Sequence, residues 1–133
     1  MSAVTHWAEA YVGTPWEKGA NCWDFFRHVQ LAQFGVDVPK VHLEAFDLRH
    51  IIKAFRDHPE RANWHRIERH ELQEGDALLM ASRRLPWHAG VWVAVNGGRV
   101  LHAPESGAML SRLADVQLAG WPQIEFYRHE PRT

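Results

Sequence analysis

Apolar residues recur at three- and four-residue spacing in three stretches of the first half of the chain, which is the period of an α-helix. The pattern predicts a short helix over about residues 3–12, a second over about residues 22–34 and a third over about residues 43–57. Gly35 follows the second stretch and Pro59 the third, and residues of these types commonly end helices.

The second half of the chain predicts strands. Residues 87–95 are the strongest strand candidate, and Asn96-Gly97-Gly98 separate them from a second apolar run at residues 99–103. An Asn-Gly pair between two such runs is typical of a hairpin. Shorter candidates are residues 64–67, 77–80 and 124–127, with a turn at 72–76, a strand beginning near Leu110 and a helical turn or loop at 112–118. Helices followed by an antiparallel sheet predict an α+β fold.

Composition indicates a folded globular domain. The chain has 133 residues, of which 46% are hydrophobic and 23% charged, and this length suits a single domain with its own core. Fifteen Lys and Arg against 16 Asp and Glu give a formal net charge of -1, without long runs of one sign. We therefore expect neither nucleic acid nor a membrane surface as a partner.

The N-terminal residues and the single cysteine set expectations about location. The first ten residues lack the basic start and apolar run of a signal peptide, and no segment has the length of a membrane span. One cysteine cannot form an intramolecular disulfide. We expect the protein to be made in the cytoplasm without a signal peptide, so that a role outside the cell would need another route of delivery.

The one cysteine, Cys22, lies at the predicted start of the second helix. Asn21 is a suitable N-cap, and Asp24 lies where a carboxylate can reach the free N–H groups of the first turn. A helix N-terminus favours a thiolate, and its N–H groups can hold an oxyanion. A lone cysteine on an apolar helix face is also commonly a small buried side chain, and these residues alone leave both interpretations open.

A nucleophilic cysteine needs a base, and the chain has ten histidines. They do not show the close ligand pairs of a zinc site, and we expect no metal and no cofactor. His88 and His102 differ from the others because they lie on the two strands of the predicted hairpin, where side chains are held rigidly. Taken alone, a histidine in such a place is more often a surface or half-buried residue than a catalytic one.

The register of this hairpin decides whether the two histidines meet. A two-residue turn at Asn96-Gly97 pairs Val95 with Gly98, places His88 opposite Glu105 and turns His102 to the other face of the sheet. A bulge, which the Gly97-Gly98 pair permits, would change this register. We expect His102 to orient His88, with Glu105 as the substitute.

Five short segments follow one another in a recognisable order. They are Gly13-Thr14-Pro15-Trp16, Asn21-Cys22-Trp23, Glu74-Gly75-Asp76-Ala77-Leu78, His88-Ala89-Gly90-Val91-Trp92-Val93 and Val100-Leu101-His102-Ala103-Pro104. Together they resemble the NlpC/P60 family of cysteine peptidases over about residues 3–127. The Asn-Cys-Trp form around Cys22 is similar to the branch found in bacteriophage tail assembly proteins and prophage products.

The resemblance implies a papain-like α+β core in one domain spanning residues 1–133. It implies Cys22 as nucleophile, His88 as general base and His102 as the polar residue that orients the base. Trp16 falls where relatives often have a substrate-contacting tyrosine, and it lacks that hydroxyl.

Two further tryptophans, Trp23 and Trp87, sit beside the proposed nucleophile and base. They are candidates for the wall of a substrate cleft, and equally for the core. Asp76 and Asp24 have structural interpretations, in a turn and a helix cap respectively.

Family members typically cut peptidoglycan stem peptides, so the resemblance implies that substrate and an association with phage tail proteins. Two alternatives stay open. An amidase or acyltransferase would use the same thiol chemistry on another substrate, and a structural tail assembly component would share the fold without needing the catalytic set.

Overall fold

The computed structural model describes residues 6–13, 22–38, 64–81, 88–103 and 107–129, apart from the side chains of Cys22, Trp23 and Ala81. Several predictions concern residues outside these ranges and are not addressed by the structure. They are the cap Asn21, the helix over residues 43–57, and the candidate site residues Trp16, Trp87 and Glu105.

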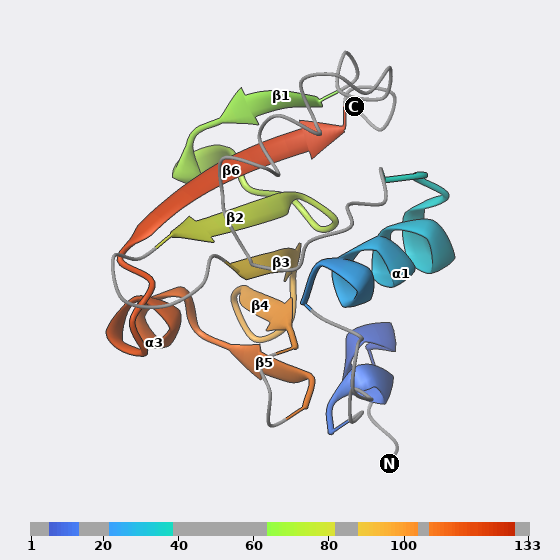
Figure 1. Cartoon of the computed structure of the whole chain (residues 1–133), viewed down its shortest axis with the longest axis horizontal. Coiled ribbons are helices and arrows are strands. Elements are labelled where there is room, and N and C mark those ends of the chain that lie inside the picture. Colours follow the sequence, from blue (N-terminus) through green and yellow to red (C-terminus); the bar gives the residue numbers. More distant parts are fainter. Residues whose placement is uncertain (1–5, 14–21, 39–63, 82–87, 104–106, 130–133) are drawn as a thin grey trace.

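The described residues form a mixed fold of helices and one antiparallel sheet, which confirms the α+β expectation (Figure 1). The elements in chain order are η1 (Trp7–Tyr11), α1 (Cys22–Phe34), β1 (Trp64–Ile67), η3 (Arg69–Glu71), β2 (Ala77–Ala81), β3 (His88–Val93), β4 (Arg99–His102), β5 (Met109–Ser111), α3 (Leu113–Leu118) and β6 (Gln123–His129). The elements η1 and η3 are 3-10 helices.

The sheet has six strands in the order β1-β6-β2-β3-β4-β5. Each described pair is antiparallel, and the C-terminal strand β6 lies between β1 and β2. The predicted strand at residues 64–67 is confirmed, whereas β6 is longer than the predicted 124–127. The hairpin β3–β4 therefore lies away from β1 and close to the β5 edge.

Helix α1 has the predicted bounds. The backbone at Gly35 turns to a φ of 66°, and the Gly35 and Val36 N–H groups bond back to carbonyls of the last turn. Such a left-handed residue closes a helix at little cost when it is glycine. The helix buries Phe25, Phe26 and Val29 and packs mainly on β3 and to a smaller extent on β4.

Alternation along β3 and β4 divides the core between the two faces of the sheet. On one face Val91, Val93 and Leu101 form a cluster with the apolar side chains of α1. On the other face Leu78, Met80 and Val100 form a second cluster with Leu113 and Val116 of α3. Figure 1 accordingly shows α1 and α3 on different sides of the sheet.

The predicted turn at residues 72–76 is confirmed, and Asp76 in it is fully buried. Its two carboxylate oxygens accept hydrogen bonds from Arg128 of β6, over 3.0 Å from Nε and 2.7 Å from Nη2. Arg128 also donates to the Glu71 carbonyl. The hydrogen bonds that Arg128 donates to Asp76 raise the pKa of Arg128. Asp76 therefore fixes the turn before β2 to the neighbouring strand, which is a structural role.

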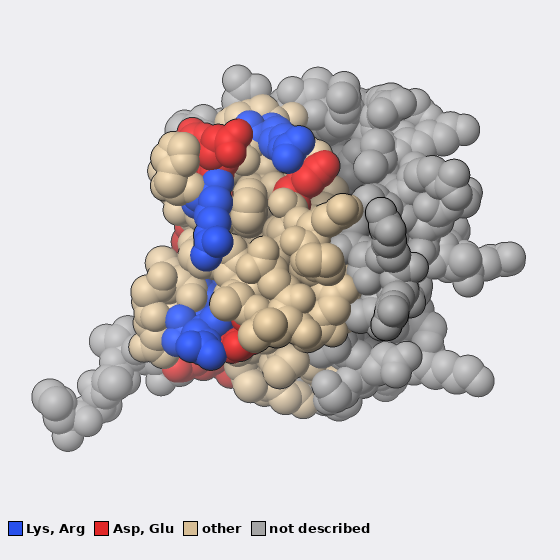
Figure 2. Space-filling view, turned by 90° about the vertical axis from the view of Figure 1, so that its left-hand side faces the viewer, with Lys and Arg blue, Asp and Glu red and all other residues tan. Residues whose placement is uncertain are grey.

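Surface charges are mixed rather than separated by sign on the face that Figure 2 shows, where acidic and basic side chains lie next to one another. Exposed pairs among the described residues include Arg112 with Asp115 at 2.8 Å and Arg66 with Glu125 at 4.0 Å. This face has no single-sign patch among its described residues. No helix in the described part of the chain is both long and apolar enough to span a membrane.

Candidate active site

The β3–β4 hairpin does not have the register of a simple two-residue loop. The Gly98 N–H bonds to the Val95 carbonyl over 2.9 Å, around Asn96 and Gly97 with φ angles of 49° and 85°. The pair of β3 and β4 residues nearest this turn, however, is Val93 with Arg99. Ala94 is therefore an extra residue on the first strand.

A carboxylate outside the hairpin accepts a hydrogen bond from the backbone N–H of this extra residue. The Ala94 N–H donates to Glu74 Oε1 over 3.2 Å. His6 Nε2 contacts the same oxygen at 2.5 Å, and Trp7 Nε1 donates to Glu74 Oε2 over 3.4 Å. The bulge is thus held in place by the turn before β2 and by the N-terminal segment. The hairpin therefore has a bulge, as contact between the two histidines required, but the extra residue is Ala94 rather than one of the glycine pair.

The shifted register places His88 and His102 on the same face of the sheet. Gly90 is the direct neighbour of His102 in the ladder, so the two histidines are diagonal neighbours rather than opposite residues. His88 Nε2 lies 2.6 Å from His102 Nδ1. The predicted contact between these two side chains is therefore confirmed, and its hydrogen bond joins neighbouring strands.

A serine continues the hydrogen-bonded chain from His102. Its second ring nitrogen, Nε2, lies 2.8 Å from Ser111 Oγ at the end of β5. Ser111 pairs with Val100 in the ladder, which again makes it a diagonal neighbour of His102. Sequence reasoning missed Ser111 because a polar residue at the end of a short strand carries no signal of its own.

Trp121 covers the other side of the base candidate. Its ring stacks on His88 with centroids 4.7 Å apart and planes inclined by 20°. Trp121 follows α3 and packs against the apolar cluster on that face of the sheet. The tryptophan and His102 together restrict the orientation of the His88 ring, and no sequence motif pointed to Trp121.

Burial keeps both imidazoles neutral at neutral pH. Each residue is only 4% exposed. Burial, with a smaller contribution from His102, lowers the pKa of His88 to about 3. Burial likewise lowers the pKa of His102 to about 4. In a hydrogen bond between two neutral imidazoles one ring donates and the other accepts, so the pair has two possible proton arrangements.

One nitrogen of the pair remains available. His88 Nε2 and both nitrogens of His102 are within hydrogen-bond distance of a neighbour. His88 Nδ1 has no hydrogen-bond partner among the described residues. This is the atom at which His88 can take up a proton.

The nucleophile candidate, Cys22, is the first residue of α1. The body of α1 packs on the face of the sheet that bears Val91 and Leu101, whereas the two histidines project from the opposite face. His88 is the first residue of β3. The structure brings His88 and His102 together and does not describe the side chain of Cys22.

A scan against models of known protein families and a search of curated proteins find no match to this chain.

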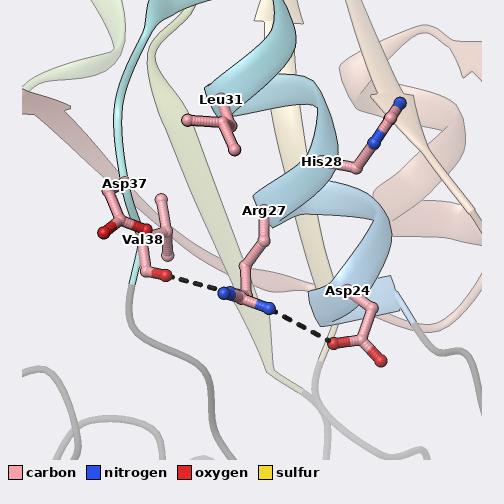
Figure 3. A pocket seen from close by; sticks show the side chains of 6 residues that line it. All are labelled: Asp24, Arg27, His28, Leu31, Asp37 and Val38. Carbon is pink, nitrogen blue, oxygen red and sulfur yellow. Dashed lines mark hydrogen bonds and ion pairs between the residues drawn. The ribbon is translucent and has the colours of Figure 1, made fainter.

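A concave site, separate from the histidine pair, lies along α1 and the segment that follows it (Figure 3). Within it Arg27 contacts two other lining residues: Nε donates to the Val38 carbonyl over 2.9 Å, and Nη1 lies 3.9 Å from an Asp24 carboxylate oxygen. None of the candidate catalytic residues lines it. Its lining residues are Asp24, Arg27, His28, Leu31, Asp37 and Val38.

The described residues offer no cluster of three or more His, Cys, Asp or Glu side chains with the geometry to hold a metal ion. The chemistry that the described arrangement supports is proton transfer at His88 Nδ1, with the ring held by His102 and Trp121.

Proposed function

We propose that the chain is a cysteine peptidase of the NlpC/P60 type, with a papain-like core, which hydrolyses amide bonds in peptidoglycan stem peptides. Cys22 is the nucleophile, His88 the general base and His102 the residue that orients the base. The observation that carries the proposal is the buried hydrogen bond between His88 Nε2 and His102 Nδ1. A base whose far nitrogen is held by a second polar group is the arrangement that nucleophilic catalysis requires.

The reaction has two acyl-transfer steps. His88 Nδ1 takes the proton from the Cys22 thiol as the sulfur attacks the carbonyl carbon of the scissile amide, and the backbone N–H of Cys22 stabilises the oxyanion. The C–N bond then breaks, the amine leaves with the proton from His88, and a thioester remains. Water, activated by His88, attacks the thioester, releases the carboxylic acid and restores the thiol.

The low pKa of His88 means that its protonated form must be stabilised during the reaction. A neutral imidazole can accept the thiol proton, but burial makes the resulting imidazolium costly. A neighbouring thiolate and the His102 Nδ1 lone pair both stabilise that imidazolium. The proposal therefore requires the sulfur of Cys22 close to His88 Nδ1, at the beginning of β3.

Trp16, Trp23 and Trp87 are proposed to line the substrate cleft. Trp23 and Trp87 adjoin Cys22 and His88 in sequence, and Trp16 falls where members of the resembled family often have a substrate-contacting tyrosine. The association proposed for the protein is with a phage tail or a prophage product, which would deliver it to the cell wall. These assignments rest on the resemblance of the motifs around Cys22 and His88.

The test is digestion of purified peptidoglycan and of soluble muropeptides, with products identified by mass spectrometry. Wild type, Cys22→Ala and His88→Gln are compared with His70→Gln, which alters an exposed histidine of η3. New stem-peptide fragments with wild type and His70→Gln alone support the proposal and identify the bond. If all four proteins fold and none releases fragments, peptidoglycan hydrolysis is excluded, and an acyltransferase or a structural tail role becomes the better explanation.

A further inference from the structure

Ser111 has no part in the mechanism described above, yet its hydroxyl bonds the orienting histidine. Oγ lies 2.8 Å from His102 Nε2, on the side of the ring away from His88. The three side chains come from β3, β4 and β5, so the hydrogen-bonded chain crosses three neighbouring strands.

The direction of these hydrogen bonds follows from counting protons. Once His88 has taken the thiol proton, both of its ring nitrogens carry hydrogen, and Nε2 must donate. His102 Nδ1 must then accept, so a neutral His102 carries its own proton on Nε2. That N–H needs an acceptor, and Ser111 Oγ is at the right distance.

Because His102 is buried, its Nε2–H depends on Ser111 Oγ as acceptor. His102 is 4% exposed, so solvent has little access to replace a lost hydrogen bond. A buried N–H without an acceptor is more costly than a ring nitrogen lone pair without a donor, and unpaired buried donors are correspondingly rare. Without the hydroxyl, His102 would favour the opposite tautomer, in which Nδ1–H donates to His88 Nε2. His88 would then carry its proton on Nδ1 and could not act as a base.

We infer that Ser111 is a positioning residue that makes the Nε2–H tautomer of His102 possible, because its hydroxyl can accept from that N–H, and thereby lets His88 Nδ1 stay free to accept a proton. As a statement about catalysis the inference rests on the proposed function. As a statement about the tautomer it concerns only described side chains and is tested separately.

The tautomer is measured by nitrogen-15 NMR of the histidine rings in a Cys22→Ala background, which needs no activity. Ser111→Thr keeps the hydroxyl and Ser111→Val replaces it with a methyl group of nearly the same shape. We expect a larger share of His102 protonated on Nε2 in the background protein and with Thr than with Val, in which Nδ1 is protonated. Ser111→Ala, which adds no atoms, replaces the Val variant if that variant does not fold.

Activity is measured with the same substitutions in the protein that retains Cys22. The Val variant should lose roughly tenfold to a hundredfold in kcat/KM relative to Thr, the range that one unpaired buried polar group produces. Equal His102 tautomers in the Thr and Val variants overturn the inference. Absence of hydrolysis by wild type overturns the proposed function instead, and the NMR result then still decides the role of Ser111.

Discussion

His88 and His102 meet across neighbouring strands as diagonal neighbours, with Nε2 of the first 2.6 Å from Nδ1 of the second. Their contact depends on one extra residue, Ala94, which shifts the hairpin register and brings both side chains to one face of the sheet. The geometry of the candidate site is therefore set at the far end of the hairpin.

Replacing His88 or His102 should reduce activity, and the size of the loss should depend on which residue is replaced and by what. His88→Gln removes the proton acceptor, and we expect kcat/KM to fall by roughly 10² to 10⁴, the usual contribution of a general base. His102→Asn keeps a polar group beside His88 Nε2 and should retain more activity than His102→Ala. Steady-state kinetics on a stem peptide test this order. Equal losses for the Asn and Ala variants would contradict an orienting role for His102.

The histidine pair should make the fold sensitive to acid. The pKa of His88 is lowered to about 3 and that of His102 to about 4, whereas an unfolded histidine titrates near 6.5. Between these values the unfolded chain binds more protons, so stability decreases as pH falls from about 6.5 toward 3. Each histidine should contribute on the order of 1–2 kcal/mol between pH 7 and 5.

Urea unfolding at both pH values measures this effect. The variants His88→Gln and His102→Asn should show a weaker loss of stability on acidification than wild type. The exposed His70→Gln variant is the control and should behave as wild type. A wild-type stability that is the same at pH 7 and pH 5 would show that the two imidazoles are not held neutral by burial.

The buried pair of Asp76 and Arg128 should be important for stability rather than for chemistry. Arg128→Ala removes both hydrogen bonds that Arg128 donates to the carboxylate of the fully buried Asp76, and we expect a loss of about 3–5 kcal/mol in the free energy of unfolding. Asp115→Asn disturbs a solvent-exposed pair with Arg112 and serves as the control, with little expected change. Comparable small effects in both variants would contradict the structural role assigned to Asp76.

Gly90 lies between the two histidine positions on the same face, and its lack of a side chain is required there. A Cβ atom at this position would lie 2.6 Å from Val100 Cγ1 and 3.2 Å from Met80 Cε. Gly90→Ala should therefore destabilise the protein by about 1–3 kcal/mol. Val100→Ala removes the closest atom, so Gly90→Ala should cost less stability when it is introduced into a Val100→Ala protein than when it is introduced into wild type. A strictly additive double variant would contradict this clash.

Local patterns predicted the elements around the site well. The apolar spacing at Cys22, Phe25 and Val29, with Gly35 after it, correctly bounded α1, because a helix is specified by neighbours in sequence. The hairpin strands were likewise found from their apolar runs. The last strand was predicted too short, since its ends are polar and gain their place by pairing with β1 and β2.

The contacts within the site depended on residues distant in sequence. The register was not predictable because Ala94 is stabilised by the Glu74 carboxylate, 20 positions away. Ser111 and Trp121 reach the histidines only through the pairing of β5 with β4 and the packing of α3. The chemistry proposed for His88 and His102 was suggested by the motifs, and the structure supplies the hydrogen bond between them.

The central claim is that the Cys22 thiol is activated by His88, and the most direct measurement is the rate at which iodoacetamide alkylates Cys22 at neutral pH. Cys22 is the only cysteine, so intact-protein mass spectrometry follows it without ambiguity. The account predicts alkylation at least about tenfold faster in wild type and His70→Gln than in His88→Gln, since the thiolate is the reactive form. Equal rates in the three folded proteins would contradict it, because Cys22 would then react independently of His88.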